Sequence, residues 1–405
     1  MSSSTLEYDP FAPAVQTDPY PFYTALRHEA PVYFVESLGA YAVSRHADVR
    51  RVMHDHAAFS SAAMAELVTR PVDMGREDGV FDAVSEESIS IVGLDGAPHT
   101  RLRTIVNRAF TPRRIGELEN EMRTIARPHI EALVADGEGD LMVGFAVPFP
   151  TVVIAAILGV DPARRVDFRR WSEHMVLAVF EPMASEQRDA VMLSGAEMGE
   201  YFDTVFAERA AKPGNDMVSL LLRAELEGGA LTGDELGVFV STLLVAGSIT
   251  TAYLIGSAVI QLVEDPALQA AVRADPRLVA GLTEEALRYE SPVQMMFRTA
   301  TSDVEVAGTT IPADATVLPL IGSANRDERV FTEPDQFDHC RPPGEALAFG
   351  HGIHHCLGAA LARLEAKVAI EELLRATPVL ELAGATERIT SLVFRGPTKL
   401  PLRFA

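Results

Sequence analysis

Cys356 is the side chain in this sequence whose surroundings most clearly favour chemistry. It lies in residues 349–358, Phe-Gly-His-Gly-Ile-His-His-Cys-Leu-Gly, and an alanine- and leucine-rich run with high helix propensity follows. This pattern predicts a turn that opens a helix, with Cys356 at the helix N-terminus. The helix macrodipole and the free backbone N–H groups there favour an anion, so we expect the pKa of the thiol to be lowered. The resulting thiolate can bind iron.

Glycines at positions 350, 352 and 358 let the backbone of this turn approach a flat ligand closely. The segment resembles the haem-binding loop of the cytochrome P450 family, Phe-Gly-x-Gly-x-His-x-Cys-x-Gly, and every fixed position matches. The resemblance implies haem b (iron protoporphyrin IX) as cofactor, with Cys356 on its iron and Phe349, Gly350 and Gly358 beside it. Thiolate ligation donates electron density that favours O–O bond cleavage. The alternative is a structural cysteine beside an ordinary helix.

The carboxylates of haem need cationic or hydrogen-bonding partners, and the fork of arginine can bind a carboxylate bidentately. The resemblance implies four such partners, which are His99, Arg103, Arg298 and His354. The first two lie one helical turn apart in Pro-His-Thr-Arg-Leu-Arg and resemble the family's His-x-x-x-Arg pair. Arg298 matches the arginine of a strand, and His354 matches the histidine of the haem loop. Each could instead be an ordinary surface base.

A long helix around residues 244–251, Leu-Val-Ala-Gly-Ser-Ile-Thr-Thr, resembles the family's oxygen-binding helix, usually Ala-Gly-x-Asp/Glu-Thr-Thr. Ala246 leaves space beside the cofactor, and Thr250 matches the catalytic threonine. Ile249 departs from the pattern, because isoleucine cannot relay a proton where the family has an acid. Water or Ser248 would then carry protons. Three readings stay open: a monooxygenase with altered proton delivery, a peroxide-using enzyme, or a chain whose acid was replaced. Thr250 could also simply bond back to the preceding turn.

A charged pair is predicted at Glu285 and Arg288, whose i, i+3 spacing places both on one face of a helix. Glu-x-x-Arg alone is a weak signal, and a surface ion pair of this kind contributes little to stability. The pair lies sixty-eight residues before Cys356 and is followed by Ser-Pro and a strand. In this place it resembles the buried Glu-x-x-Arg motif of the family, whose role is structural.

The resemblance implies a substrate pocket over the haem, and the residues predicted to line it are mostly apolar. They are Ile249, Val293, Met295, Met296 and Phe394, together with the loop before His99. Methionine adds flexible, polarizable surface, and Gln294 could supply one polar contact. The expectation is a small or medium hydrophobic substrate, aromatic substrates included. Several of these side chains could instead pack the core.

The elements that would position these residues are mainly helical. A 3.6-residue period predicts helices over 112–135, 147–158, 162–180, 185–211, 232–264 and 276–289. Strand patterns predict a hairpin over 31–43, a second small sheet over 301–319 and another hairpin over 392–404. Between 325 and 343 we expect irregular chain, which resembles the family's meander.

Length and composition are ordinary for a soluble enzyme with a large core, since 48% of the 405 residues are apolar and 23% are charged. No signal peptide or membrane-spanning run is evident, so a cytoplasmic location is expected. The formal net charge of −22 argues against nucleic acid and an anionic membrane as partners. Cys340 is expected to be a free thiol, because a disulfide would consume Cys356.

Basic residues are nonetheless clustered, and an acidic electron-transfer protein could dock on them. The cluster comprises Arg101, Arg103, Arg108, Arg113, Arg114 and Arg363. The alternative is that some are solvated and others bind the cofactor.

The fold expected from these features is a single mainly α domain over residues 1–405, with small β-sheets, of the cytochrome P450 fold. The resemblance implies a haem-thiolate monooxygenase that inserts one oxygen atom from O2 into its substrate, by hydroxylation or O-dealkylation. Electrons from NAD(P)H would arrive through a ferredoxin reductase and a ferredoxin, because no flavin or iron–sulfur domain is fused here. The rivals are a peroxide-dependent peroxygenase and a non-catalytic haem-binding or sensor protein.

Overall fold

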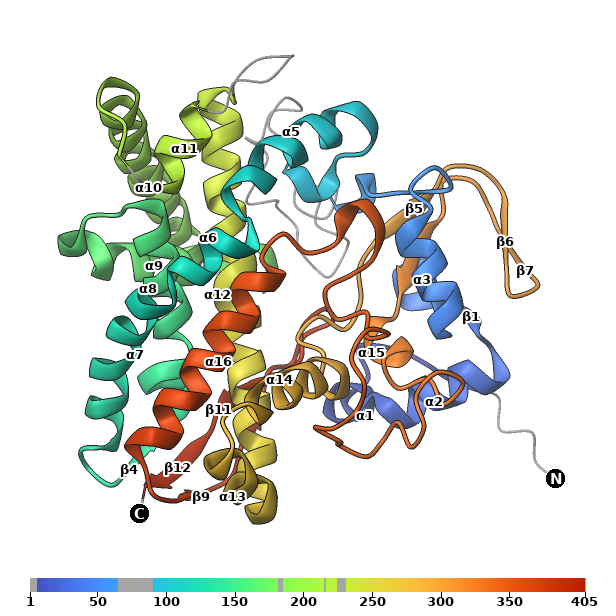
Figure 1. Cartoon of the computed structure of the whole chain (residues 1–405). Helices are drawn as coiled ribbons and strands as arrows, with labels where there is room; N and C mark the ends of the chain where they lie inside the picture. The colour runs from blue at the N-terminus through green and yellow to red at the C-terminus, as the bar shows by residue number, and fades with distance from the viewer. Residues whose placement is uncertain (1–5, 65–89, 181–184, 215, 224–230, 405) are drawn as a thin grey trace.

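The fold is mainly helical with small β-sheets, as the sequence predicted. The computed structural model describes residues 6–64, 90–180, 185–214, 216–223 and 231–404. Helices α6 to α13 gather on one side, whereas α1 to α3 and the strands β1 and β5 to β7 lie on the other (Figure 1). The helices are α1 (Pro13–Thr17), α2 (Tyr20–Glu29), α3 (His46–His54), α5 (Gly96–Ala109), α6 (Pro112–Glu117), α7 (Glu119–Val134), α8 (Pro148–Leu158), α9 (Arg165–Phe180), α10 (Ser185–Ala211), α11 (Met217–Arg223), α12 (Gly233–Glu264), α13 (Pro266–Ala274), α14 (Leu278–Tyr289), α15 (Ile321–Ala324) and α16 (Ala359–Ala376).

Short 3-10 turns and one π-helical turn lie between these helices and the strands. They are η1 (Glu36–Leu38), η2 (Ile91–Gly93), η3 (Met142–Ala146, the π-helical turn), η4 (Pro162–Arg164) and η5 (Gly352–His354). The last of them, η5, lies inside the turn that precedes α16.

Helix α12 runs through the centre of the molecule and contacts α8, α9, α14 and α16. Its start is fixed by a capping box, in which the backbone N–H of Glu235 donates to the Thr232 hydroxyl and the Glu235 carboxylate accepts from the backbone N–H of Thr232. In the described part of the chain it is the one helix long and apolar enough to cross a membrane. Half of its most apolar window is buried inside the fold, however, which is also typical of a core helix.

The strands form one sheet of five strands and three smaller ones in the described chain. In the largest sheet the order is β1-β2-β8-β5-β3, with β2 and β8 parallel. The strands are β1 (Val32–Val35), β2 (Ala40–Val43), β3 (Phe59–Ser60), β4 (Glu138–Asp140), β5 (Arg298–Ala300), β6 (Val304–Val306), β7 (Thr309–Ile311), β8 (Thr316–Pro319), β9 (Leu380–Leu382), β10 (Glu387–Arg388), β11 (Pro397–Lys399) and β12 (Pro401–Phe404).

The predicted helices are confirmed, with differences at their boundaries. The segment predicted as one helix over 112–135 is two, α6 and α7, because the chain tightens at Leu118, whose N–H donates to the carbonyl of Ile115. Gly116, a poor helix former, lies just before this break. Helix α10 has the predicted bounds, and α9 is preceded by the short turn η4.

The strand predictions were less accurate. The hairpin over 31–43 is confirmed as β1 and β2. Within 301–319, β6 and β7 pair as a hairpin, but β8 joins the large sheet beside β2. The hairpin predicted over 392–404 is wrong, since β11 pairs with β10 and β12 pairs with β4 and β9. These partners lie outside the predicted segment, so its local pattern could not reveal them.

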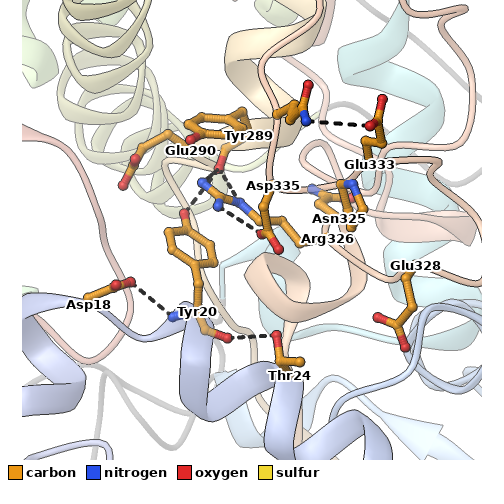
Figure 2. A network of polar contacts seen from close by, with 12 residues as sticks. Asp18, Tyr20, Thr24, Tyr289, Glu290, Asn325, Arg326, Glu328, Glu333 and Asp335 are labelled. Carbon is orange, nitrogen blue, oxygen red and sulfur yellow. Dashed lines mark hydrogen bonds and ion pairs between the residues drawn. The ribbon is translucent and has the colours of Figure 1, made fainter.

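A cluster around Arg326 ties the N-terminal helix α2 to the end of α14. The guanidinium lies between two aromatic rings, 3.5 Å from the centroid of Tyr20 and 3.8 Å from that of Tyr289. It also donates hydrogen bonds to the Tyr289 carbonyl and to the carboxylate of Asp335 (Figure 2). The Tyr289 carbonyl accepts a further hydrogen bond from the Tyr20 hydroxyl. The irregular chain over 325–343 is thus anchored at its beginning to two helices.

Candidate functional site

The turn before α16 is held in place by backbone and side-chain hydrogen bonds. Gly350 and Gly352 have positive φ values of 74° and 76°, which glycine adopts readily. The N–H of Cys356 donates to the carbonyl of Phe349 (2.8 Å), which closes the turn. Helix α16 begins at Ala359, so Cys356 lies three residues before the helix rather than at its first position.

The sequence analysis predicted a lowered pKa for the thiol of Cys356, and the structure corrects this prediction. The side chain is exposed, yet it lies deep enough among protein atoms that burial raises the pKa of the thiol above its ordinary value. The backbone N–H groups of Gly358 and Ala359, with Arg103 and Arg363, act in the opposite direction but do not outweigh burial. The prediction that the helix terminus lowers the pKa of this thiol is therefore wrong for the protein without a bound metal. Metal ligation would have to favour the thiolate.

Three of the four predicted carboxylate partners meet beside this turn. The rings of His99 and His354 lie 4.3 Å apart between centroids. Nε2 of His99 is buried and has no hydrogen-bond partner among the described residues. Arg298 is 2% exposed, and its guanidinium donates to the carbonyl of Phe297. Burial lowers the pKa of Arg298 from its ordinary value. An unpartnered imidazole nitrogen and a buried guanidinium fit a ligand that carries carboxylates.

Arg103, the fourth predicted partner, contacts the turn itself. Its Nη2 donates to the carbonyl of His355 (2.6 Å), and it lies close enough to Cys356 for the two groups to influence each other's pKa. Phe349 is covered by the guanidinium of Arg363, which lies 4.5 Å from the ring centroid. Together with the three residues above, these contacts place a thiol and several nitrogen donors around one region, as haem b requires.

The predicted site residues on helix α12 differ in their exposure and in their hydrogen bonds. Ala246 is exposed although it lies in the middle of a core helix, which is consistent with space left for a ligand. The Thr250 hydroxyl donates to the Ala246 carbonyl (2.7 Å), the back-bonding that the sequence analysis kept open. Ser248 is buried, and its hydroxyl donates to Leu244 (2.7 Å). Ile249 is partly buried and packs against the main core cluster.

The predicted substrate residues do not all face one region. Val293 and Phe394 form an isolated antiparallel bridge, which brings two of them together. Met296 is partly buried, whereas Met295 is 1% exposed and packs in a core cluster with Tyr8. The packing therefore favours the core alternative for Met295, and its contact with substrate stays a prediction. Most of the loop before His99 lies outside the described residues.

Glu285 and Arg288 form a buried, bidentate pair. The guanidinium donates from Nε to Oε2 (2.8 Å) and from Nη2 to Oε1 (2.7 Å) of Glu285. Its Nη1 donates to the carbonyl of Asn325 (2.9 Å), and the Asn325 side chain accepts the N–H of Leu347 (2.6 Å). The pair is thus linked through Asn325 to the turn that carries Cys356. The sequence analysis missed a third member, Arg341, whose Nε donates to Glu285 (3.2 Å).

Asp95 is a further residue of this region that the sequence analysis missed. It directly precedes α5, and its carboxylate accepts hydrogen bonds from the Ser60 hydroxyl (2.6 Å), the Ser61 N–H (2.8 Å) and Nε2 of His354 (3.2 Å). Burial acts to raise the pKa of Asp95, but these hydrogen bonds outweigh it and lower the pKa. Burial lowers the pKa of His354 to about 4, so this ring is neutral at neutral pH. An aspartate just before a helix usually indicates a helix cap, so the sequence held no signal for this role.

Glu365 on α16 is a second titratable group that the sequence analysis did not identify. It is 1% exposed, and its Oε1 has no hydrogen-bond partner among the described residues. Burial raises the pKa of this carboxyl well above its ordinary value, and a hydrogen bond with Thr251 opposes the rise in part. Burial therefore favours the protonated form of this acid next to α12.

Replacing Glu365 with glutamine should stabilise the chain increasingly as the pH rises. The folded protein keeps a proton on Glu365 that the unfolded chain releases, so folding becomes less favourable with rising pH. We expect the difference in the free energy of unfolding between Glu365→Gln and the unchanged protein to grow from about pH 5 to about pH 8, measured by urea denaturation.

A matched control for this comparison lies on the same helix. Glu372 is also buried, but Arg123, Arg127 and Arg375 pair with it. Glu372→Gln should lower stability at about pH 8, because it breaks these ion pairs. A pH-independent effect of Glu365→Gln would show that Glu365 is not held protonated.

Comparison with known proteins gives the same indication as the geometry. A family model described as cytochrome P450 matches residues 171–380. The chain is 40% identical to the erythromycin C-12 hydroxylase of Saccharopolyspora erythraea, over 86% of this chain and 84% of that protein. It is also similar to the structure of CYP109Q5 from Chondromyces apiculatus, with a TM-score of 0.86, 40% identity and 98% of each chain covered. CYP109E1 from Bacillus megaterium, in complex with testosterone, has a TM-score of 0.85 and 32% identity, with 96% of this chain and 99% of that one covered.

Proposed function

Because the chain belongs to the cytochrome P450 family, we propose that it inserts one oxygen atom from O2 into a small or medium hydrophobic substrate. The family consists of haem b monooxygenases, and this chain is an oxidoreductase of that kind. The proposal concerns the substrate and the source of electrons. The proposed reaction rests on one observation about the cofactor site: Cys356 lies in a closed turn beside the nitrogen groups of His99, Arg103 and Arg298.

The proposed roles follow from where each side chain lies. Haem b supplies iron-centred redox chemistry with O2 when it is bound. Cys356 provides the sulfur ligand, while Arg298, His99 and His354 hold the carboxylates at the edge of the cofactor. Arg103 donates to the turn and keeps a positive charge near the sulfur. The hydroxyl of Thr250 lies one helical turn after the exposed Ala246 and can hold a proton there.

The substrate is proposed to be hydrophobic because the side chains available to line the pocket are apolar. Ile249, Val293, Met296 and Phe394 offer few groups that could hydrogen bond to a polar molecule. The names of relatives support this choice, since one is a hydroxylase of erythromycin and another was solved with testosterone. A rigid, medium-sized ring system is therefore a suitable first substrate class to test, by hydroxylation or O-dealkylation.

A ferredoxin, reduced by NAD(P)H through a ferredoxin reductase, is proposed as the electron donor. Arg108, Arg113 and Arg114 are exposed on α5 and α6, and positive charge on an otherwise acidic protein would attract an acidic partner. Arg113 also forms an exposed pair with Glu117, which contributes little. The other members of the predicted cluster are engaged, because Arg101 pairs with Glu235, Arg363 pairs with Glu284 and Arg103 donates to the carbonyl of His355. We also propose a single domain over residues 1–405 and a cytoplasmic location.

Spectral titration of the ferric protein tests the substrate proposal. A panel of hydrophobic compounds is added, and displacement of water from the iron is scored by the change of the absorption spectrum. Compounds that bind are then supplied with a ferredoxin, its reductase and NADPH, and products are identified by mass spectrometry. Binding of polar compounds alone would contradict the proposed substrate class. Binding without product under every reductant and oxidant would favour a sensor.

A peroxide-dependent peroxygenase is the second candidate, and Ile249 is the observation that favours it. Isoleucine cannot deliver a proton, but this matters less for a reaction in which hydrogen peroxide already supplies the protons. Feeding peroxide without redox partners distinguishes the two reactions. Turnover comparable to that with ferredoxin would support the peroxygenase and contradict the dependence on a partner.

Ile249→Asp should raise product formation with ferredoxin and NADPH by at least about tenfold, because a positioned acid typically contributes about two to four orders of magnitude. The fraction of NADPH electrons recovered in product should rise with it. Ile249→Asn is the matched control, since it has the same shape as aspartate without the acid. Equal coupling in both variants would show that proton delivery at this position does not limit the reaction.

A further inference from the structure

Asp338, His339 and Cys340 bring three different metal-binding groups together at the protein surface. A carboxylate oxygen, a ring nitrogen and the sulfur all lie within 4.8 Å of one another, and the Cys340 sulfur is 3.4 Å from Nε2 of His339. Asp338 and Cys340 are exposed, and His339 is partly buried. In the described chain this is the one group of three such side chains that could hold a metal ion. The proposed function uses none of the three.

The backbone that carries these side chains is held against helix α14. The N–H of Asp338 donates to Oε1 of Glu285 (2.9 Å), and Oδ1 of Asp338 accepts the N–H of Cys340 (2.9 Å). The carbonyl of His339 lies against Gly281, so closely that a Cβ at this position would overlap the carbonyl oxygen. The three side chains therefore start from fixed backbone positions, which lowers the entropic cost of bringing them onto one ligand.

Arg341, the next residue in the chain, carries a positive charge that could repel a cation. Its guanidinium is held by other groups, because it donates to the carboxylate of Glu285 (3.2 Å) and to the carbonyl of Thr332 (2.8 Å). The negative charge of Glu285 offsets part of the charge of Arg341. The whole chain has a formal net charge of −22, which attracts cations. The charges around the three residues therefore permit a divalent cation.

The types of ligand and their spacing fit zinc. Sulfur, imidazole nitrogen and carboxylate oxygen all bind zinc, whereas magnesium and calcium prefer oxygen alone. With a Zn–S distance of about 2.3 Å and a Zn–N distance of about 2.0–2.1 Å, tetrahedral geometry separates the sulfur and the nitrogen by about 3.6 Å. The 3.4 Å between Cys340 and His339 is close to this value. A small rotation of the Asp338 side chain would supply the third ligand, and water the fourth.

We propose that Asp338, His339 and Cys340 bind one Zn²⁺ ion. Zinc forms bonds to the Cys340 sulfur, to Nε2 of His339 and to a carboxylate oxygen of Asp338. The thiol proton passes to the solvent on binding, and nothing is oxidised or reduced. His339 keeps its one proton on Nδ1, so Nε2 has a free lone pair for the metal. The site is separate from the one proposed for haem, because its sulfur is that of Cys340 and not that of Cys356.

Calorimetric titration of the reduced holoprotein with zinc chloride measures the binding. We expect one Zn²⁺ per chain, and X-ray absorption at the zinc edge should show one sulfur at about 2.3 Å. Cys340→Ser should remove this sulfur and weaken binding by at least about tenfold, since even residues that only support a ligand contribute about 10–100-fold. His339→Ala should weaken binding similarly. Asp338→Asn should weaken it less, because asparagine keeps an oxygen for the N–H of Cys340 but loses the charge.

His28→Ala is the matched control for zinc on surface histidines. His28 is 54% exposed and lies 3.1 Å from a carboxylate oxygen of Glu328, but this pair belongs to no group of three in the described chain. His28→Ala should leave the zinc affinity unchanged. Equal affinity of Cys340→Ser and the unchanged protein would overturn the inference, as would equal affinity for Mg²⁺. Loss of the haem absorbance during the titration would place zinc at Cys356 and would also overturn it.

A second readout follows the thiol of Cys340 itself. Iodoacetamide alkylates an exposed thiol, and a thiol bound to zinc reacts more slowly because its electron pair is held by the metal. Mass spectrometry of the peptide that contains Cys340 should show alkylation at least about tenfold slower with Zn²⁺, with no slowing by Mg²⁺ and full reactivity after addition of a chelator. In His339→Ala the protection should be smaller. Alkylation at an unchanged rate in saturating Zn²⁺ would overturn the inference.

Discussion

Replacing Cys356 with histidine or serine should abolish the red-shifted ferrous carbon monoxide band of the purified protein, together with all hydroxylation. As the proposed iron ligand, the sulfur would donate electron density that favours O–O bond cleavage, and neither imidazole nor hydroxyl replaces it. Histidine should still retain some haem, because a nitrogen ligand binds iron well. The measurements are the reduced carbon monoxide difference spectrum, the ratio of haem to protein, and product formation above a protein-free background.

The chain contains its own control for this experiment. Cys340 is the other cysteine, it is also free and exposed, and it lies in the irregular segment before the turn. Cys340→Ser should leave the spectrum, the haem content and the activity unchanged. If Cys340→Ser lost the band while Cys356→Ser kept it, the assignment of the iron ligand would be refuted.

Arg288→Met should destabilise the folded chain by about 3 kcal/mol, the low end of the usual cost of removing one partner of a buried ion pair, because Arg341 still donates to Glu285. Both side chains are almost fully buried, at 2% and 3% exposure, and Glu285 would lose two short hydrogen bonds. Arg288 also donates to the Asn325 carbonyl, and Asn325 holds Leu347 just before the turn of Cys356. We therefore expect the haem content of the purified protein to fall as well.

Urea denaturation of the holoprotein gives the stability change, with haem absorbance followed in the same titration. Arg277→Met is the matched control just before the same helix, because Arg277 is 90% exposed in its pair with Asp275 and such pairs contribute little. Equal stability of the Arg288 and Arg277 variants would contradict the structural role of the buried pair. Loss of haem without loss of stability would show that Arg288 acts on the turn alone.

The sequence predicted several features because they depend on neighbouring residues. Helix α10 has the bounds given by its 3.6-residue period, and α12 begins at Gly233, one residue after the predicted start. The turn of residues 349–358 could be recognised from its glycines and cysteine, since local geometry and ligand type are written in adjacent positions. Such features are set by propensity and spacing, which a chain carries before it folds.

Predictions failed where distant segments had to meet. The C-terminal hairpin was wrong because β12 pairs with β4 and β9, partners that its own pattern does not specify. The thiol of Cys356 has a raised pKa because burial, which depends on the whole fold, outweighs the N–H groups of Gly358 and Ala359 beside it. An argument from the helix terminus includes the effect of the N–H groups on the pKa but not the effect of burial.

What the sequence determined by itself is the chemical type of this protein: one cysteine in a glycine turn, basic residues that are proposed to bind the haem carboxylates, and an apolar residue where an acid is usual. The tertiary structure decided how these groups are oriented. Asp95 joins residues 34, 35 and 259 positions away in the chain, and Glu365 faces Thr251 across two packed helices. Such contacts come from the packing of whole elements against one another, and no local spacing encodes them.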